Sequence, residues 1–332
     1  NTVWLAQGRR LLRSDDDGVT WHKRAVLPVS GFRECLVNHR LGRRLGRVGF
    51  HHFAPVGPDS AVIVAHRHIF RLRAGDPVLQ RRAPLVGSRP LAFCVNRGVA
   101  YYGEYTGNPK RRQVHVWGAP VDDLKHWEPL SCFNNVRHIH GVFFDRFANG
   151  FWITTGDDDH EAGLWMTSDD FRNTELVLGG EQRYRTVQPL FTSDYVYFGS
   201  DSPERDNYIY RVERSTGEVE TLTKVGGPVF YGCQVSSNLF FSTVVEPSRT
   251  NKSRLVELWG SAGGDKWHLL KRFRKDLLPM KYFQYGQVCF PAGSGDAQNL
   301  WYTTVATERD HRTLKVKAIS LFEDLPARGP VD

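Results

Sequence analysis

Hydrophobic residues along this chain fall in short runs rich in valine, isoleucine, phenylalanine and tyrosine, and clusters of glycine, proline, asparagine and aspartate separate the runs. Few stretches place apolar residues at the i, i+3, i+4 and i+7 positions that one face of a helix requires. Short β-rich runs bounded by turn-forming residues instead indicate strands. The pattern therefore predicts an all-β protein with little helix.

The strand candidates group in fours, and the groups recur about every 48 residues. Three groups align well: Leu91–Asn96, Val99–Tyr105, Gln113–Trp117 and Trp127–Leu130; then Ile139–Phe144, Gly150–Thr155, Gly163–Thr167 and Glu175–Leu178; then Val187–Phe191, Tyr195–Gly199, Tyr208–Val212 and Val219–Thr223. This period is the length of one four-stranded propeller blade, which can bury its faces only against its neighbours.

The same pattern continues less regularly towards both ends of the chain. Two groups precede the aligned ones and two follow them, beginning at Val3, Arg47, Val229 and Gln287. No stretch is typical of a linker between domains, and the 31 glycines and 17 prolines fit many short strands and turns. We therefore expect one seven-bladed β-propeller domain over residues 1–332, with six blades as the alternative if a terminal group is shared.

The segment Ser14–Trp21 reads S-x-D-x-G-x-T-W. It resembles the Asp-box, or BNR repeat, of sialidases and related β-propellers. In such a turn Asp16 would cap backbone N–H groups and Gly18 would adopt a positive φ. The resemblance implies a blade turn in a sialidase-like propeller, and Gly260–Trp267 looks like a decayed copy. Classical sialidases also carry an F/Y-R-I-P motif, which Ser88-Arg89-Pro90 matches only in part.

The charge of the chain narrows the choice of partner. Its formal net charge is +8 and its pI is about 9.3, which favours an anionic partner. No zinc-finger, helix-turn-helix, RNA-recognition or KH signature is found, so an acidic oligo- or polysaccharide is expected rather than a nucleic acid. No run approaches 18 apolar residues, so no membrane association is expected.

The five cysteines are widely spaced and form no metal-type CxxC pair. This usage favours a reducing, cytoplasmic compartment. The chain begins at Asn1 rather than Met. A secreted protein with a trimmed leader therefore remains the alternative.

Three arginines occupy like places just before the first strand of successive groups. Arg89, Arg137 and Arg185 are separated by equal intervals of 48 residues, so we expect them to converge and bind a substrate carboxylate or sulfate. Sialidases hold their substrate carboxylate with three arginines, and the resemblance implies a similar clamp here.

Acidic residues follow the second strand of successive groups. They are Glu104, Asp157, Asp158, Asp201 and Glu246. A pair of carboxyl groups is what glycoside hydrolysis needs, one as acid and one as nucleophile or base. We expect Asp157, Asp201 and Glu104 to be catalytic and Asp158 and Glu246 to bind substrate. The alternative is that these acids and the arginines only neutralise one another.

Histidines suggest a second chemistry. His138 and His140 are two residues apart at the start of one strand and so share a side of it. Either could act as the base of a β-elimination, with Tyr105 and Tyr282 among the tyrosines available to bind substrate. The pattern assigns no metal ligand and no cofactor; a divalent metal at a His-rich site, completed by Gln188 or Gln234 as in oligogalacturonate lyases, is the alternative.

These features together favour a carbohydrate-active enzyme, either a glycoside hydrolase or a polysaccharide lyase. It would act on an acidic glycan bound at the central mouth of the propeller. The alternative is a non-catalytic propeller that binds a glycan or a protein, in which the acids are paired off.

Overall fold

The computed structural model describes residues 2–293 and 297–323, and these form two compact units. The first unit contains residues 2–186, 279–284 and 292–293, and the second contains residues 187–278, 285–291 and 297–323. The expectation of a single domain over residues 1–332 remains a prediction.

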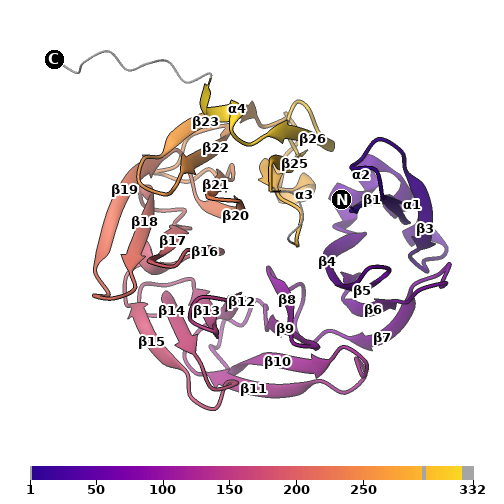
Figure 1. Cartoon of the computed structure of the whole chain (residues 1–332), viewed down its shortest axis with the longest axis horizontal. Helices are drawn as coiled ribbons and strands as arrows, with labels where there is room; N and C mark the ends of the chain where they lie inside the picture. Colours follow the sequence, from indigo (N-terminus) through magenta and orange to yellow (C-terminus); the bar gives the residue numbers. More distant parts are fainter. Residues whose placement is uncertain (1, 294–296, 324–332) are drawn as a thin grey trace. The chain divides into compact units, whose positions relative to one another are not determined.

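The fold is all-β, and its seven antiparallel sheets are the seven blades of a β-propeller, as the sequence predicts (Figure 1). Within each sheet, hydrogen-bonded neighbours are consecutive strands, so every blade is a meander of hairpins. Among the described residues, five blades have four strands, and the blades nearest the two ends of the chain have three each.

The first unit holds four blades. Their strands are β1 (Val3–Gln7), β2 (Arg10–Ser14) and β3 (His22–Val26); β4 (Phe50–Gly57), β5 (Ser60–Ala65), β6 (His68–Leu72) and β7 (Gln80–Pro84); β8 (Phe93–Asn96), β9 (Val99–Gly103), β10 (Val114–Pro120) and β11 (Glu128–Phe133); β12 (His138–Asp145), β13 (Gly150–Gly156), β14 (Gly163–Thr167) and β15 (Glu175–Gly179). Its short helices are α1 (Phe32–Asn38), α2 (Arg40–Gly46), the 3-10 helix η1 (Gln182–Tyr184) and α3 (Met280–Phe283).

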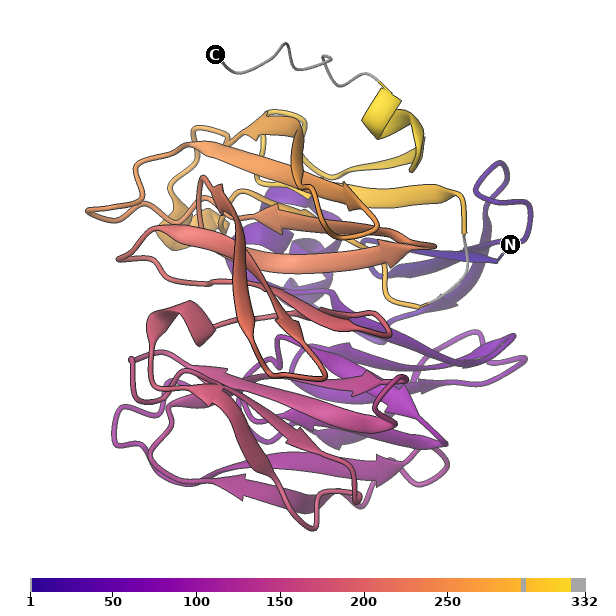
Figure 2. The same cartoon turned by 60° about the vertical axis from the view of Figure 1, so that its left-hand side comes forward.

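The second unit holds three blades and one short helix. They consist of β16 (Pro189–Phe191), β17 (Tyr195–Gly199), β18 (Asn207–Glu213) and β19 (Val219–Val225); β20 (Val229–Val235), β21 (Asn238–Thr243), β22 (Leu255–Ala262) and β23 (His268–Arg274); β24 (Gln287–Cys289), β25 (Asn299–Val305) and β26 (Arg312–Lys317); and helix α4 (Ser320–Glu323). Figure 2 shows β20–β23 lying alongside one another, in orange.

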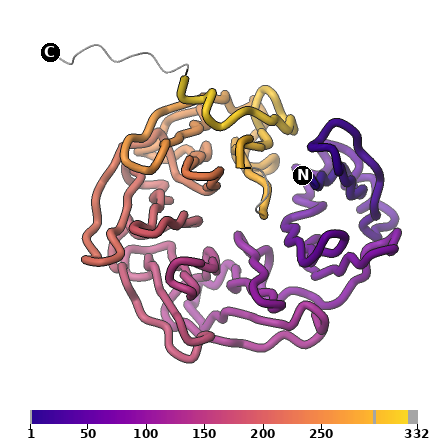
Figure 3. The backbone as a smooth tube through the Cα atoms, in the orientation of Figure 1, coloured from indigo at the N-terminus to yellow at the C-terminus, as the bar shows by residue number. Residues whose placement is uncertain are grey.

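Within a blade, the inner strands are apolar and buried, whereas the outer strand is partly exposed. Every residue of β13 is buried, and this strand reads as a continuous run, Gly-Phe-Trp-Ile-Thr-Thr-Gly. The last strand of the same blade, β15, exposes its first three residues. Figure 3 traces the backbone, which reverses direction from β13 to β14 and again from β14 to β15. The inner strands are therefore held by apolar contacts on both faces, whereas the outer strand borders solvent.

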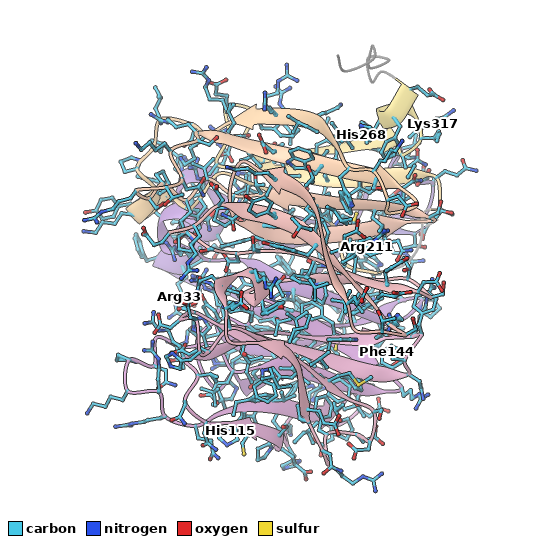
Figure 4. The ribbon with its side chains drawn as sticks, turned by 90° about the vertical axis from the view of Figure 1, so that its left-hand side faces the viewer. Arg33, His115, Phe144, Arg211, His268 and Lys317 are labelled. Atoms are coloured by element: carbon cyan, nitrogen blue, oxygen red, sulfur yellow. The ribbon has the colours of Figure 1, made fainter. Side chains whose placement is uncertain are left out.

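Neighbouring blades within the first unit bury their faces against each other. One apolar cluster joins Tyr101 and Val116 of the β8–β11 blade to Ile139 and Ile153 of the β12–β15 blade, and the partly buried Phe144, labelled in Figure 4, packs against it. At Gly103 a Cβ would lie 2.7 Å from the Cβ of Ile139, so this close approach of two blades needs a glycine. A similar cluster in the second unit joins the β16–β19 and β20–β23 blades.

The turn predicted at Ser14–Trp21 joins β2 to β3, and its expected hydrogen bonds are present. Asp16 accepts the backbone N–H of Thr20 at 2.8 Å and its hydroxyl at 2.6 Å. The Ser14 hydroxyl accepts the N–H of Gly18 at 2.8 Å, and Gly18 has a φ of 88°. The indole of Trp21 donates to the Gly18 carbonyl. The turn geometry is thus confirmed.

The sequence pattern did not predict the short helices α1 and α2, and α2 carries most of the basic run Arg40–Arg47. Arg44 in this run is 1% exposed and donates from Nε and Nη2 to the carbonyl of Phe283, at 2.9 and 2.8 Å. It therefore fixes α3 within the first unit instead of facing solvent or a partner. Among the described residues, no helix combines the length and hydrophobicity that crossing a bilayer requires.

Candidate ligand-binding site

The candidate site lies in the first unit, where β12 begins and β13 ends. These strands are antiparallel neighbours, and His138 pairs with Gly156 in their register. Arg137, just before β12, and Asp157, just after β13, are therefore brought to the same end of one blade. The residue before the first strand and the residue after the second strand of this blade therefore lie together.

The carboxylate of Asp157 is the centre of this site. Its Oδ2 lies 3.1 Å from Nη1 of Arg137, and its Oδ1 lies 3.1 Å from Nη2 of Arg185. The backbone carbonyl of Asp157 accepts a second bond from Arg185 Nη1 at 3.2 Å and one from the Gln182 amide at 2.7 Å. Two of the three predicted arginines thus converge, and they converge on a carboxylate of the protein itself.

Two buried histidines face the same carboxylate oxygen. The Nε2 atoms of His138 and His140 lie 3.3 and 3.5 Å from Asp157 Oδ1 and 3.2 Å from each other. On the opposite side of each ring, Nδ1 of His138 lies 3.0 Å from the Thr106 carbonyl and Nδ1 of His140 lies 2.9 Å from the Thr186 carbonyl. Because a carbonyl only accepts, both Nδ1 atoms must carry the proton.

Local irregularities of β12 and β13 place the His140 ring. The register between the strands shifts between Ile139 and Gly141, so His140 is the extra residue of a β-bulge. At Gly156 an added Cβ would lie 2.9 Å from Cε1 of His140 and 3.2 Å from Cγ of Arg185. The glycine therefore leaves the space that these two side chains occupy.

A buried glutamate that was not among the predicted site residues, Glu161, supports the site through backbone hydrogen bonds. The side chain of Glu161 is 0% exposed, and its Oε2 accepts the backbone N–H groups of Arg137 at 3.0 Å and Asp157 at 2.9 Å. Its Oε1 contacts Nε of Arg111, whose Nη2 lies 2.5 Å from Oδ2 of Asp158. Glu161 thus ties together the two backbone segments that carry the central ion pairs.

Electrostatics keep the central carboxylate ionised. Burial by itself acts to raise the pKa of Asp157, but the contacts with His138 and His140 and the charge of Arg185 outweigh it and hold the pKa far below its usual range. Burial lowers the pKa of His140, because a charged ring would lose hydration there. Asp157 is therefore a permanent anion beside a neutral His140 near neutral pH.

The exposed side of the site carries Arg137 and Tyr105. The side chain of Arg137 is 35% exposed, yet its Nε is buried and has no hydrogen-bond partner among the described residues. The ring of Tyr105 packs on the His138 ring, with 4.1 Å between centroids. A buried guanidinium N–H without an acceptor is a feature that a bound ligand could satisfy.

Three other predicted residues of the first unit have partners of their own. Arg89 donates to the Arg47 carbonyl at 3.4 Å. Glu104 lies 3.4 Å from Nδ1 of His115, a β10 residue labelled in Figure 4. Asp158 pairs with Arg111 on the surface. Their predicted roles in catalysis and substrate binding remain predictions.

The remaining candidates lie on other elements. Asp201, 2% exposed, and Glu246 belong to the second unit, and Tyr282, 52% exposed, lies on α3. The two glutamines considered as metal ligands bond to backbone groups of the second unit: Gln188 exchanges two hydrogen bonds with Gly232, and Gln234 donates to the Ser236 carbonyl.

Comparison with known proteins supports the fold and no more specific class. No known protein family and no curated protein matches the chain. Among solved structures, YCF48 bound to D1 peptide is 12% identical, with a TM-score of 0.59 over 96% of this chain and 88% of that one. A chain of the mitotic checkpoint complex is 12% identical, with a TM-score of 0.53 over 96% and 87%.

A putative TolB from Agrobacterium tumefaciens is 13% identical, with a TM-score of 0.50 over 68% of this chain and 82% of that one. At such identities the likeness shows the β-propeller fold alone. None of these three proteins is named as a carbohydrate-active enzyme. The sialidase-like family suggested by Ser14–Trp21 is therefore not established, and the chain is described by the coarser class, a seven-bladed β-propeller.

Proposed function

We propose that this chain is a ligand-binding propeller that recognises the anionic group of an acidic oligosaccharide at Asp157 and its neighbours. The observation that carries the proposal is the buried Nε of Arg137, which lacks an acceptor while Nη1 of the same guanidinium pairs with Asp157. Buried polar groups are nearly always satisfied, so an acceptor from a ligand is the natural partner. The guanidinium fork suits a carboxylate or sulfate oxygen.

Charge supports an anionic ligand. Asp157 is one negative charge facing the positive charges of Arg137 and Arg185, so this group retains an excess of positive charge. Glu161 does not cancel the excess, because it is paired with Arg111. The ring of Tyr105 beside His138 offers a flat surface on which a sugar can lie.

The ionisation of Asp157 and the contacts of its carboxylate favour ligand binding without hydrolysis. A general acid must hold a proton near neutral pH, whereas the pKa of Asp157 is held far below its usual range. A nucleophile needs an oxygen open to the anomeric carbon, whereas Oδ1 faces two histidines and Arg185, and Oδ2 faces Arg137. Asp157 is therefore suited to orienting cations and not to attacking a glycoside.

A second function, β-elimination from a uronate, is favoured by one specific contact. The tilted rings of Tyr105 and His138 place a phenol and an imidazole together, and Arg137, the residue before His138, could hold the uronate carboxylate. Removal of the proton next to a carboxylate needs such a base and such a cation. This reaction would form an unsaturated uronate that absorbs in the near ultraviolet.

The test is a glycan array probed with the full chain, followed by titration of the best uronate-, sialate- or sulfate-bearing oligosaccharide. Arg137→Gln should weaken binding by about 10-fold or more, since it removes a charged hydrogen-bond donor. Arg183→Gln is the matched control, because Arg183 is 43% exposed and pairs with Glu181 nearby on the chain. Equal weakening by both substitutions, or no binding to any anionic glycan, would refute the proposal. Ultraviolet-absorbing product from the bound glycan would replace it with the lyase.

A further inference from the structure

We propose that His138, His140 and Asp157 form a binding site for a divalent transition-metal ion, with Zn²⁺ as the best match. Their ligand atoms all lie within 4.8 Å of one another, and both histidines are buried. The inference goes beyond the binding function proposed above and does not depend on it, because a metal ion can be titrated without any glycan.

The histidine tautomers are the first argument. Because Nδ1 of each ring donates to a backbone carbonyl, Nε2 is the ring nitrogen that each histidine can offer to a metal ion. The two Nε2 atoms and Oδ1 of Asp157 lie 3.2–3.5 Å from one another. A metal ion among these three atoms could bind all of them at once. A backbone carbonyl behind each metal-binding imidazole is also the usual outer-shell arrangement.

The distances are the second argument. Zn²⁺ binds imidazole nitrogen and carboxylate oxygen at about 2.0–2.2 Å, so neighbouring corners of its tetrahedron lie about 3.4 Å apart. The three separations here, 3.2, 3.3 and 3.5 Å, form one face of such a tetrahedron. An octahedral ion at the same bond length would need corners about 3.0 Å apart, which fits less well.

The surrounding structure holds these atoms in place. His140 is the extra residue of the β12 bulge, and the missing side chain of Gly156 leaves room for its ring. Glu161 fixes the backbone N–H of Asp157. A metal site differs from a chance cluster because its ligating side chains are held rigidly. Hydrogen bonds from surrounding residues hold them in place.

The fourth position would be open to a ligand. Two histidines and one carboxylate leave one corner of a tetrahedron for water or a substrate oxygen, as in catalytic zinc sites. Arg137 and Arg185 flank the site and would favour an anionic oxygen there. Asp157 can contact both a metal ion and the arginines, since Oδ1 faces the histidines and Arg185 while Oδ2 pairs with Arg137.

The test is metal titration of the purified full chain after treatment with a chelator. Zn²⁺ is followed by calorimetry and elemental analysis, and Co²⁺ by its visible spectrum, which is intense when four ligands surround the ion. We expect one high-affinity ion per chain and the four-coordinate cobalt spectrum. A wild-type chain that binds no ion tightly, or gives only the weak spectrum of six-coordinate cobalt, would overturn the proposal.

Variants then locate the site. His138→Gln, His140→Gln and Asp157→Asn should each weaken Zn²⁺ binding more than 100-fold, beyond the roughly 10–100-fold typical of outer-shell changes. His126→Gln is the matched control, because its side chain is 80% exposed and lies outside the cluster. Loss of binding in the control but not in the cluster variants would mean adventitious surface binding and refute the site. If the buried variants do not fold, the cobalt spectrum of the wild-type chain still decides.

Discussion

The ring of His140 occupies the space that a side chain at Gly156 would fill, since an added Cβ would lie 2.9 Å from its Cε1 atom. The two residues lie on adjacent strands, and His138, two residues before His140, is the register partner of Gly156. The glycine at the end of β13 thus makes room for one of the two histidine rings of the site.

Gly156→Ala should therefore displace His140, Arg185 or both. We expect a loss of about 1–3 kcal/mol in the free energy of unfolding, the usual cost of overpacking, and at least a 10-fold loss of Zn²⁺ affinity. Urea unfolding and calorimetry measure the two effects. Gly107→Ala is the control, since a Cβ at Gly107 would meet nothing within 4 Å. If Gly156→Ala left the free energy of unfolding and the Zn²⁺ affinity unchanged, the space beside Gly156 would not confine the His140 ring.

Asp157 should make stability depend on pH. Its pKa is lower in the folded chain than its ordinary value of 3.8, so the unfolded chain binds a proton more readily. The carboxylate therefore stabilises the fold above about pH 4, and this stabilisation falls as the pH drops below that value. At pH 7, Asp157→Asn should lower the free energy of unfolding by about 3 kcal/mol, because it leaves Arg137 and Arg185 without their anion.

Urea unfolding of both proteins from pH 7 to pH 3 checks this prediction. The difference between wild type and Asp157→Asn should shrink as the pH falls below about 4. Parallel stability profiles across the range would show that Asp157 titrates alike in the folded and unfolded chains.

Glu161→Gln should loosen the site without removing any group that contacts a ligand. Glu161 is fully buried, and its charge is balanced by Arg111. Gln keeps the shape but loses that pair, so we expect a loss of about 2–3 kcal/mol in stability and weaker Zn²⁺ binding by about 10-fold. Asp158→Asn is the control, because Asp158 pairs with the same arginine at the surface. If Asp158→Asn lowered stability and Zn²⁺ affinity as much as Glu161→Gln, the losses would come from the changed pairing of Arg111 and not from Glu161 itself.

The blade repeat made part of the site predictable. Arg137, Arg185 and Asp157 sit at places that the repeat fixes, just before first strands and just after a second strand, and the structure brings them together. Their mutual neutralisation was the alternative interpretation of the pattern. The bulge that makes His140 an extra residue was not predictable, because only the strand register reveals it.

Glu161 and Arg111 were missed for a physical reason. Both lie in loops whose conformation the repeat does not set, after β13 and after β9 respectively. One signal was present: Glu161 directly precedes the buried residues Ala162 and Gly163, and an acid next to a buried strand needs a partner. The short helices α1 and α2 were missed because each spans only seven residues.

A second turn repeats the hydrogen bonds of Ser14–Trp21. Between β14 and β15, Asp169 accepts the backbone N–H of Asn173 at 2.9 Å, and the Thr167 hydroxyl accepts that of Phe171 at 3.2 Å. In the sequence, Thr167, Asp169 and Asn173 have the same spacing as Ser14, Asp16 and Thr20. Phe171 replaces the glycine and adopts a φ of 67°.

Ser14→Ala and Thr167→Val should each lower the free energy of unfolding by about 1–2 kcal/mol. Each removes a buried hydroxyl that accepts a backbone N–H and donates to the turn aspartate, and so leaves a donor unsatisfied. Zn²⁺ affinity should stay within about 2-fold of wild type, since neither hydroxyl contacts the three ligand residues. Ser193→Ala, at an exposed turn, is the control and should change stability by less than about 0.5 kcal/mol. If Ser14→Ala and Thr167→Val changed the free energy of unfolding as little as this control, the hydroxyl hydrogen bonds of the two turns would not contribute to the stability of the blades.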